Sequence, residues 1–339
     1  MLELRDLRPD WESAWANTVA VLPGATLFHQ PDWLRVLQRT QHLEFVPLAI
    51  VQDDHVVGVL PIFVKSYGPF KIAASPFDVT DTPYLGPLTD TPCWSQLLRA
   101  VSVWARRHHV AFVRLLVPPE QSRALSLESG VEGRVHISPI AKSTHILDLT
   151  QGLERTWKGF RDGCRSAIKK AQRAGLKVSF CRDPAHIDGY YQIADALFRA
   201  QGRRHPNSRE FFHSLWQHFA PSGNVSLLLA TLDGRLLGGV FLGHFRETVY
   251  YLDGASDPEG KRLQATNLLL WESIQWATER GYGAFDFVGS DIPRLARFKE
   301  GFGGRLHSYW CLEISLGRVA RLLRTAYPRW KVWAARVRS

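Results

Sequence analysis

The sequence contains an approximate internal repeat, and this feature constrains the fold more than any other. Residues 49–59 and 230–240 both have the pattern of a strand, a tight polar turn and a second strand. The matching positions are Asp53 with Asp233 and Gly58 with Gly238, each pair 180 positions apart. A chain that repeats such a hairpin is expected to contain two similar halves.

Two further matches occur in the same order along the chain. Upstream of the hairpins, residues 31–37 and 209–215 share a helical spacing of bulky side chains. Downstream, a helix leads into a buried strand in residues 103–113 and again in 275–286. The order helix, hairpin, helix, strand therefore predicts two α/β domains, which we place at residues 1–145 and 146–313, followed by a basic amphipathic tail at 314–339.

The net charge of +10 and the isoelectric point of 9.6 predict an anionic partner. Charge alone leaves nucleic acid, a phosphorylated metabolite and anionic lipid open. No stretch approaches ~18 uninterrupted apolar residues, and residues 1–15 lack the apolar core of a signal peptide. We therefore expect a cytoplasmic protein, either free or at the inner face of the membrane.

The four cysteines are far apart and have no histidine at zinc-ligand spacing beside them. They are interpreted as reduced thiols, and no metal site is predicted. The chain also lacks a G-x-S-x-G elbow, a P-loop, an H-E-x-x-H motif and a Rossmann fingerprint. These absences disfavour hydrolase, kinase, protease and dehydrogenase functions.

Four cations follow one another at i, i+4 spacing on the predicted helix after Leu153. They are Arg161, Arg165, Lys169 and Arg173. Unpaired cations in a row repel one another, so the row indicates contact with a phosphate-rich substrate or an RNA backbone. A solvated basic face is the alternative.

A polar loop at residues 201–209 contains Arg203 and Arg204, whose guanidinium groups suit phosphate or carboxylate oxygens. A plain charged turn is the alternative. The helix predicted from Thr266 begins after Gly260 and several cations, which is a weak phosphate-binding pattern because a cradle usually needs several glycines. Asn267 and Trp271 lie one turn apart near its start, where core packing or capping competes with ligand contact.

Two charged residues near the end of the second half have two interpretations each. Asp286 lies between aromatic residues in a strand, and we interpret it as a buried structural carboxylate rather than a site residue. Lys299 precedes a segment with Gly301, Gly303 and Gly304, where a lysine can stabilise an oxyanion or a phosphate. A surface lysine paired with Glu300 is the other interpretation.

Four segments together resemble the FemABX-like (lipid II aminoacyltransferase-type) branch of the GNAT acyltransferase superfamily. They are residues 160–171, the pair Tyr250 and Tyr251, residues 285–287 and residues 298–304. The resemblance extends over residues 145–313 and more loosely over the first half. It implies an α/β fold of two tandem GNAT-like domains, each a mixed twisted sheet flanked by helices. Members transfer an amino acid from aminoacyl-tRNA to a peptidoglycan-precursor amine, and relatives use acyl-CoA or make natural products.

The resemblance also implies site residues. The family's lysine near the C-terminal end corresponds to Lys299, and its Gly-Pro-x-x-Asp element corresponds to residues 86–90, which end at Asp90 and follow Tyr84. The expected substrate-binding residues are Tyr84, Arg161, Arg165, Arg203, Arg204, Tyr251, Asn267 and Trp271. The chain lacks the long coiled-coil insertion of some members, so acyl-CoA stays open as donor.

Our hypothesis for the mechanism is that Lys299 stabilises the oxyanion, that Arg203 and Arg204 hold acceptor phosphates, and that Asp90 orients or deprotonates the amine. We expect an acyltransferase in cell-envelope or natural-product assembly, with aminoacyl-tRNA as the favoured donor, acyl-CoA as the alternative and no tightly bound cofactor. A non-catalytic membrane-peripheral or RNA-binding protein is the second alternative, because residues 318–339 combine cations with tryptophans as interfacial helices do.

Overall fold

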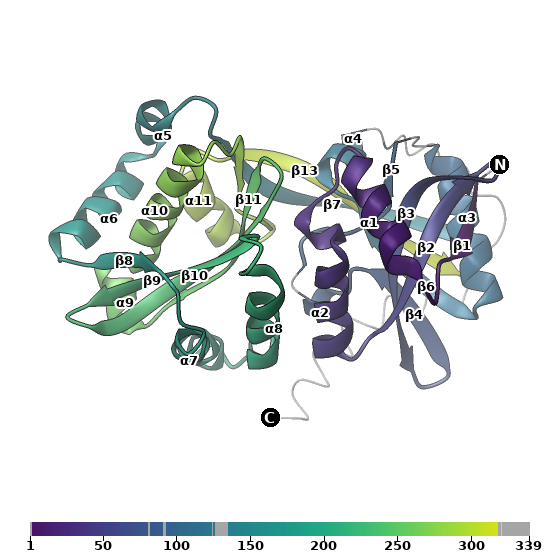
Figure 1. Cartoon of the computed structure of the whole chain (residues 1–339), viewed down its shortest axis with the longest axis horizontal. Helices are drawn as coiled ribbons and strands as arrows, with labels where there is room; N and C mark the ends of the chain where they lie inside the picture. The colour runs from purple at the N-terminus through teal and green to yellow at the C-terminus, as the bar shows by residue number, and fades with distance from the viewer. Residues whose placement is uncertain are drawn as a thin grey trace. The chain divides into compact units, whose positions relative to one another are not determined.

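The computed structural model describes residues 2–80, 82–90, 93–123, 125, 135–317 and 320. Two compact units are present (Figure 1). Unit 1 consists of Met1–Ala141 and Tyr309–Ser339, and unit 2 of Lys142–Ser308. The sequence places the end of the second domain at residue 313, whereas the chain returns to unit 1 at Tyr309, because strand β13 pairs with β6 there. Of the predicted tail at 314–339, residues 314–316 belong to strand β13, and the rest lies outside the described residues except for residues 317 and 320.

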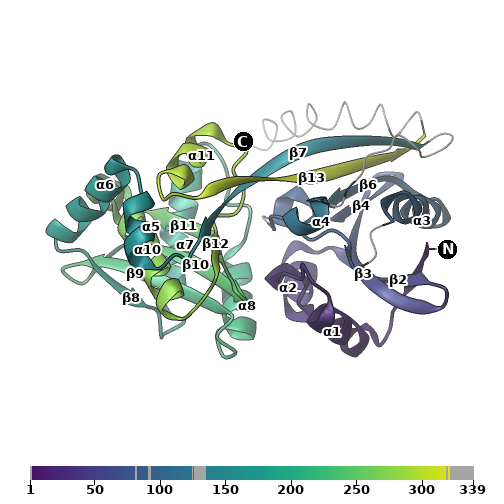
Figure 2. The same ribbon diagram turned by 90° about the horizontal axis from the view of Figure 1, so that it is seen from above.

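Unit 1 has the hydrogen-bonded strand order β1-β2-β3-β4-β6-β13, with the short β5 on β3. Helices α1 and α2 contact each other, as Figure 2 shows, and pack on β3 and β2, while α3 packs on β1 and β6. The elements are β1 Leu2–Asp6, α1 Trp11–Val21, η1 Leu27–His29, α2 Pro31–Gln41, β2 Glu44–Gln52, β3 His55–Tyr67, β4 Phe70–Ser75, η2 Asp78–Thr80, β5 Leu88–Thr89, α3 Trp94–Arg107, β6 Val110–Leu116 and α4 Pro119–Arg123.

Unit 2 has the strand order β7-β12-β11-β10-β9-β8. Strands β7 and β13 each contribute residues to both units. Helices α7 and α8 cover one face of the sheet, and α6 and α10 cover the other (Figure 1). The elements are β7 Val135–Asp148, α5 Leu153–Gly159, α6 Asp162–Arg173, β8 Lys177–Phe180, α7 His186–Arg199, α8 Arg209–Phe219, β9 Val225–Leu232, β10 Arg235–Phe245, β11 Thr248–Ser256, α9 Pro258–Leu263, α10 Ala265–Glu279, β12 Ala284–Asp286, α11 Pro293–Glu300 and β13 Arg305–Leu316.

The predicted repeat is confirmed in the register of the two hairpins. Asp53 and Asp233 both have positive φ at the tight turns. Gly58 faces Ile50, and Gly238 faces Ala230, so both glycines keep the offset of 180 positions. In both hairpins the register shifts by one residue immediately before the glycine. The bulge is thus duplicated together with the hairpin.

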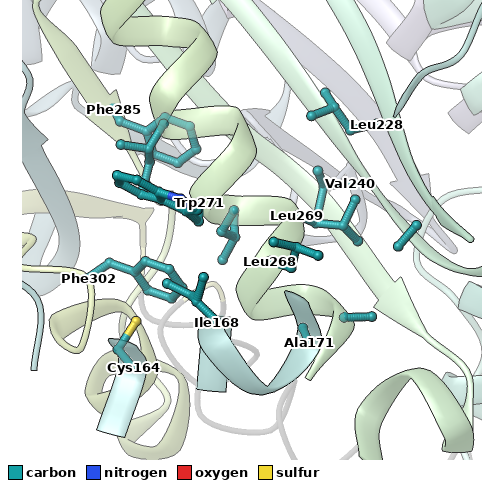
Figure 3. Close-up of a cluster of buried hydrophobic side chains, with 14 of the residues drawn as sticks. Cys164, Ile168, Ala171, Leu228, Val240, Leu268, Leu269, Trp271, Phe285 and Phe302 are labelled. Carbon is teal, nitrogen blue, oxygen red and sulfur yellow. The ribbon is translucent and has the colours of Figure 1, made fainter. Parts of the chain in front are cut away.

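The core of unit 2 between the sheet and the helices α6 and α10 is apolar. Leu228 and Val240 from the sheet are fully buried against Ile168 of α6 and Leu269 of α10, as Figure 3 shows. Because side chains alternate along a strand, Leu227 and Phe241 face α7 and α8 instead, where Phe241 contacts Tyr190. The central strands of unit 2 are therefore buried on both faces.

Candidate functional site

Strand β11 has an edge that its neighbour leaves unpaired. β11 pairs with β12 in parallel only from Thr248 to Tyr250, because β12 ends at Asp286 opposite Tyr250. From Tyr251 to Ser256, β11 pairs with β10 alone, and no strand in the described part of the chain pairs with its other edge. We call this stretch the open edge. Its first residues are partly exposed, so backbone N–H and C=O groups there can bind an extended ligand.

A bulge lies within the open edge. Tyr251 faces Leu242 on β10, whereas Asp253 faces Phe241, so Leu252 is the extra residue of β11. Residues two positions apart normally share a face of a sheet, and the bulge breaks that rule here. Tyr251 packs against the core under α10, while Asp253 points to the face of α7. The sequence alone gives no sign of this reversal.

Asp253 belongs to a polar group that ties α7 and the 201–208 loop to β11. The hydroxyl of Tyr190, which is fully buried, donates a hydrogen bond of 2.6 Å to Asp253 Oδ2. His205 Nε2 lies 3.3 Å from the same oxygen, and its side chain is fully buried. The backbone N–H of Asn207 donates to His205 Nδ1 at 3.1 Å, which fixes the imidazole in the loop. None of these three side chains was predicted as a site residue.

Lys299 is buried, with 5% of its surface exposed, and lies in the last turn of α11. Its ammonium group donates hydrogen bonds to the carbonyl oxygens of Val288 and Gly289. Val288 has a φ of 52°, which a β-branched residue adopts only when its surroundings enforce it. The interpretation of Lys299 as a surface lysine paired with Glu300 is therefore wrong, and the ammonium holds the segment after β12.

Asp286 is the buried structural carboxylate that the sequence predicts. It is 1% exposed, and Asp286 Oδ1 accepts hydrogen bonds from Thr144 Oγ1 at 2.6 Å and from the N–H of Val288 at 2.8 Å. Burial raises the pKa of Asp286 to about 7, while the hydrogen bond from Val288 and the charge of Lys299 act in the opposite direction. Asp286 and Lys299 thus stabilise the same segment from two sides.

The predicted basic row on α6 is only partly available to a ligand. Arg161 forms an ion pair of 2.6 Å with Glu300. Arg165 pairs with Asp162 and donates to carbonyl oxygens at the end of α5, among them that of Lys158 at 3.0 Å. These two arginines thus join helices, and their role in substrate binding stays a prediction. Lys169 and Arg173 are exposed and form no ion pair within the described residues.

Asn267 and Trp271 lie in the core rather than at a ligand surface. Trp271 is 8% exposed and packs against Trp157 and Phe160, with its ring centroid 4.7 and 5.4 Å from theirs. Asn267 is 9% exposed, and its amide lies 4.0 Å from the thiol of Cys164. Packing of α10 against α5 and α6 therefore accounts for the burial of both, and their role as substrate-binding residues stays a prediction.

The predicted arginine loop separates its two arginines. Arg203 lies over the ring of Phe198, with 5.6 Å between the guanidinium carbon and the ring centroid. Arg204 lines a shallow pocket of about 550 Å³ together with Tyr191, Asp195, Arg199, His205, Pro206 and Ser208. Arg199 and Arg204 thus share one pocket, and His205 connects this pocket to Asp253. The two adjacent arginines of the sequence do not line it together.

The region before α10 contains both a carboxylate and backbone N–H groups that could bind an anion. The carboxylate of Asp257 accepts a hydrogen bond of 2.6 Å from the N–H of Gly260 and so caps α9. The N–H groups of Ala265 and Thr266 begin α10, and neither has an acceptor among the described residues. An anion here would gain two backbone donors but would lie near the carboxylate of Asp257.

In unit 1, the chain itself fills the space that corresponds to the open edge. β4 and β6 pair in parallel up to Ser75 and Leu115. Just beyond this pair, the N–H of Leu85 donates to Leu116 O at 3.2 Å, and the N–H of Gly86 donates to Ser75 O at 3.3 Å. The loop between β4 and β5 therefore bonds to both strands where they diverge. Unit 2 has no such loop, because β11 is continuous.

We call Leu85 and Gly86, which hydrogen-bond to β6 and β4, the plug of unit 1. Tyr84 precedes the plug in the sequence, and Asp90 follows it. Tyr84 is 2% exposed and packs between Phe28 and Tyr309 in the core of unit 1, and its role in substrate contact stays a prediction. Asp90 is exposed. Thr89 pairs with Gly58 in unit 1, and Ser256 pairs with Gly238 at the equivalent place in unit 2. The next residue in each unit is an aspartate, so Asp90 corresponds to Asp257, which caps α9. The catalytic role expected of Asp90 stays a prediction.

The described residues contain no group of three His, Cys, Asp or Glu side chains close enough to hold a metal ion. Among the helices of the described part of the chain, none is long and apolar enough to cross a membrane.

Comparison with known proteins gives a family match within unit 2. Residues 158–300 match the family model described as an acetyltransferase (GNAT) domain. These residues include the open edge, the Tyr190–Asp253–His205 group and Lys299. Comparison of the sequence with curated proteins gives no significant match.

Solved structures with the same fold extend over nearly the whole chain. FemX has 15% sequence identity and a TM-score of 0.64, with 91% of this chain and 96% of FemX covered. The C-terminal domain of a putative lysylphosphatidylglycerol synthetase from Agrobacterium fabrum has 13% identity and a TM-score of 0.58, with 92% and 94% covered. A tandem GNAT protein from the clavulanic acid biosynthesis pathway has 11% identity and a TM-score of 0.52, with 94% and 99% covered.

Residues 158–300 thus form a domain of the GNAT acyltransferase type. The chain as a whole has the tandem GNAT fold that the resemblance to the FemABX-like branch predicts, so the predicted fold class is confirmed.

Proposed function

We propose that unit 2 transfers an aminoacyl group from aminoacyl-tRNA to an amine acceptor. The observation that carries this proposal is the open edge of β11 within a domain that matches the acetyltransferase family. An extended acyl donor can bind to such an edge as an added strand. The backbone N–H groups of the edge are then available as donors to the oxyanion that develops on the carbonyl oxygen.

The transfer itself needs little from side chains. The amine nitrogen forms a bond to the ester carbonyl carbon, and the bond from that carbon to the ribose oxygen breaks. The amine loses one proton and the ribose oxygen gains one. An α-amine with an ordinary pKa of ~7.7–8.0 is already partly neutral at cellular pH, so a strong base is not required.

Lys299 has a different part in this proposal from the one first expected of it. Its ammonium is already bonded to the carbonyls of Val288 and Gly289. It therefore supports the segment that follows β12 and keeps β12 from extending along β11. We regard it as a positioning residue for the open edge.

The exposed cations of unit 2 favour tRNA over a small donor. Lys169 and Arg173 on α6 and Lys261 on α9 are exposed and form no ion pair within the described residues, and α6 contacts α9. A row of cations along two helices suits a phosphate backbone, which carries charge over a long distance. The name of one neighbour, a putative lysylphosphatidylglycerol synthetase, contains an aminoacyl group and so agrees with an aminoacyl donor.

Acyl-CoA is the second candidate donor. The N–H groups of Ala265 and Thr266, which have no acceptor in the described residues, could bind a diphosphate at the start of α10. The nearby carboxylate of Asp257 opposes such binding. The name of the tandem GNAT neighbour mentions AcCoA, so acyl-CoA donors are included in the experiment below.

One experiment separates the two donors. The protein is incubated with a panel of aminoacyl-tRNAs and acyl-CoAs together with a mixture of primary amines, and mass spectrometry follows loss of the acyl group from each donor. We expect discharge of one aminoacyl-tRNA or a few. Discharge of an acyl-CoA alone would support the second candidate, and an amine-independent signal would show hydrolysis only. Absence of discharge from every donor would contradict the proposal.

A further inference from the structure

Asp253 presents one carboxylate oxygen that the protein does not use. Both contacts of the carboxylate, from Tyr190 and from His205, involve Oδ2. Asp253 Oδ1 has no hydrogen-bond partner among the described residues, and no lysine or arginine there pairs with Asp253. The side chain is only 14% exposed. A mostly buried carboxylate without a cationic partner is costly, so an outside group that neutralises it is expected.

The position of Asp253 limits what that group can be. Asp253 lies on the open edge, between the bulged Leu252 and Gly254. A donor bound along this edge places its carbonyl carbon beside these residues. In an aminoacyl ester, the α-ammonium is attached one carbon away from the carbonyl carbon, and the nucleophilic amine approaches the same carbon. A carboxylate at this place is therefore within reach of a primary ammonium group from either substrate.

We infer that Asp253 Oδ1 binds the primary ammonium group of a substrate, while the hydroxyl of Tyr190 fixes the carboxylate through Oδ2. The inference rests on the proposed function and names the substrate class more closely. Three N–H donors of an ammonium suit a carboxylate oxygen, and the pair is nearly enclosed by α7 and the 201–208 loop. An acetyl group carries no ammonium. If the ammonium belongs to the donor, this contact therefore selects aminoacyl donors over acetyl donors.

The test compares two donors that differ in one atom. The wild type and Asp253→Asn are assayed with an aminoacyl-tRNA that the wild type discharges and with the α-hydroxyacyl-tRNA obtained from it by deamination. We expect kcat/KM of Asp253→Asn to fall about 30-fold or more with the aminoacyl donor and to change less than about threefold with the hydroxyacyl donor. This outcome assigns the ammonium to the donor.

Other outcomes have defined meanings. An equal loss with both donors, together with a raised KM for the acceptor amine, would assign the ammonium to the acceptor and keep the inference. No loss, or an equal loss with an unchanged acceptor KM, would overturn it.

Two matched variants separate binding from structure. Tyr190→Phe removes the hydrogen bond to Oδ2 but keeps the carboxylate, so it should retain the preference for the aminoacyl donor. If Tyr190→Phe and Asp253→Asn lost activity equally with both donors, Asp253 would serve only to tie α7 to β11. Asp233→Asn makes the same chemical change at a hairpin turn and should leave both rates unchanged.

Failure of the proposed function would be visible separately. If the wild type discharged no donor, calorimetry with an aminoacyl-adenosine amide and its α-hydroxy analogue would still test the ammonium contact. Tighter binding of the amino analogue by the wild type, lost in Asp253→Asn, would support the contact without any catalysis. Equal binding of both analogues, together with binding of a primary amine that is unchanged in Asp253→Asn, would overturn it.

Discussion

The ring of Tyr251 occupies the space that a side chain at residue 254 would need. A Cβ added to Gly254 would lie 2.2 Å from the hydroxyl oxygen of Tyr251 and 2.8 Å from its ring carbons. Gly254→Ala must therefore move Tyr251 at the open edge, and we expect kcat/KM to fall at least about tenfold. Steady-state kinetics with the discharged donor measures this.

The matched control for this substitution is Gly163→Ala. Gly163 lies in α6, and no atom lies within 4 Å of an added Cβ. Alanine in a helix is more favourable than glycine by up to about 1 kcal/mol, so the control should be slightly more stable with unchanged kinetics. Unchanged activity in Gly254→Ala would show that the position of Tyr251 does not matter.

Lys299→Met tests whether the buried lysine positions the segment after β12. The carbonyls of Val288 and Gly289 lose their donor in this variant, and we expect the free energy of unfolding to fall by about 3 kcal/mol together with activity. Urea denaturation and kinetics measure the two effects. Arg297→Met, at an exposed position of the same helix, should change stability by less than about 0.5 kcal/mol. Loss of activity with unchanged stability would instead favour the original oxyanion role.

Asp286 makes stability depend on pH. Burial raises its pKa from 3.8 to about 7, so the folded state favours the protonated form. The stability gained is complete below the unfolded pKa and is lost as pH rises toward 7. Asp286→Asn cannot ionise, and its amide oxygen can still accept from Thr144 and Val288.

The variant should therefore gain roughly 2–3 kcal/mol relative to the wild type between pH 5 and pH 7. Urea denaturation of both proteins across this range measures the difference. Parallel pH profiles for the two proteins would show that Asp286 ionises normally in the fold.

The plug in unit 1 predicts one donor site per chain. Leu85 and Gly86 already hydrogen-bond to the diverging ends of β4 and β6, so an extended donor cannot bind there. Native mass spectrometry with a non-hydrolysable aminoacyl-adenosine amide should show one bound molecule per chain. Two sites of equal affinity would contradict the assignment of donor binding to unit 2.

The exposed cations of α6 predict a salt-dependent affinity for tRNA. Replacing Lys169 and Arg173 by glutamine should lower tRNA affinity and reduce the slope of log K against log salt by about 2. Filter binding at several salt concentrations measures this. Arg161→Gln is the control, because Arg161 is paired with Glu300 and should affect the slope less. An equal effect of both changes would mean that the whole row contacts RNA.

Local sequence patterns predicted much of the architecture. Asp53 and Asp233 mark two tight turns. Gly58 and Gly238 lie in strands where an added Cβ would lie 2.4 and 2.5 Å, respectively, from the carbonyl oxygen of a neighbouring strand. Turn chemistry and close backbone approach act over a few residues, so the sequence displays them directly. For the same reason the resemblance of residues 145–313 to an acyltransferase family could be recognised from short motifs.

Side-chain roles were less accessible to the same reasoning. Arg161 and Arg165 look like a free basic row until α11 and α5 provide their partners. Lys299 was expected to stabilise an oxyanion, whereas in the fold its ammonium donates to the carbonyl oxygens of Val288 and Gly289. Apart from Asp162, which lies three residues before Arg165 in the same helix, these partners come from other parts of the fold, so spacing along one helix could not reveal them.

The sequence by itself determined that the chain has two related α/β halves and that the second resembles an acyltransferase. Only the tertiary structure decided where a ligand can bind, because the open edge results from β12 ending at Asp286 while β11 continues to Ser256. The contact between Tyr190 and Asp253 joins residues 63 positions apart. A one-residue bulge reverses the direction of Asp253, and a bulge depends on the pairing of two strands rather than on either strand alone.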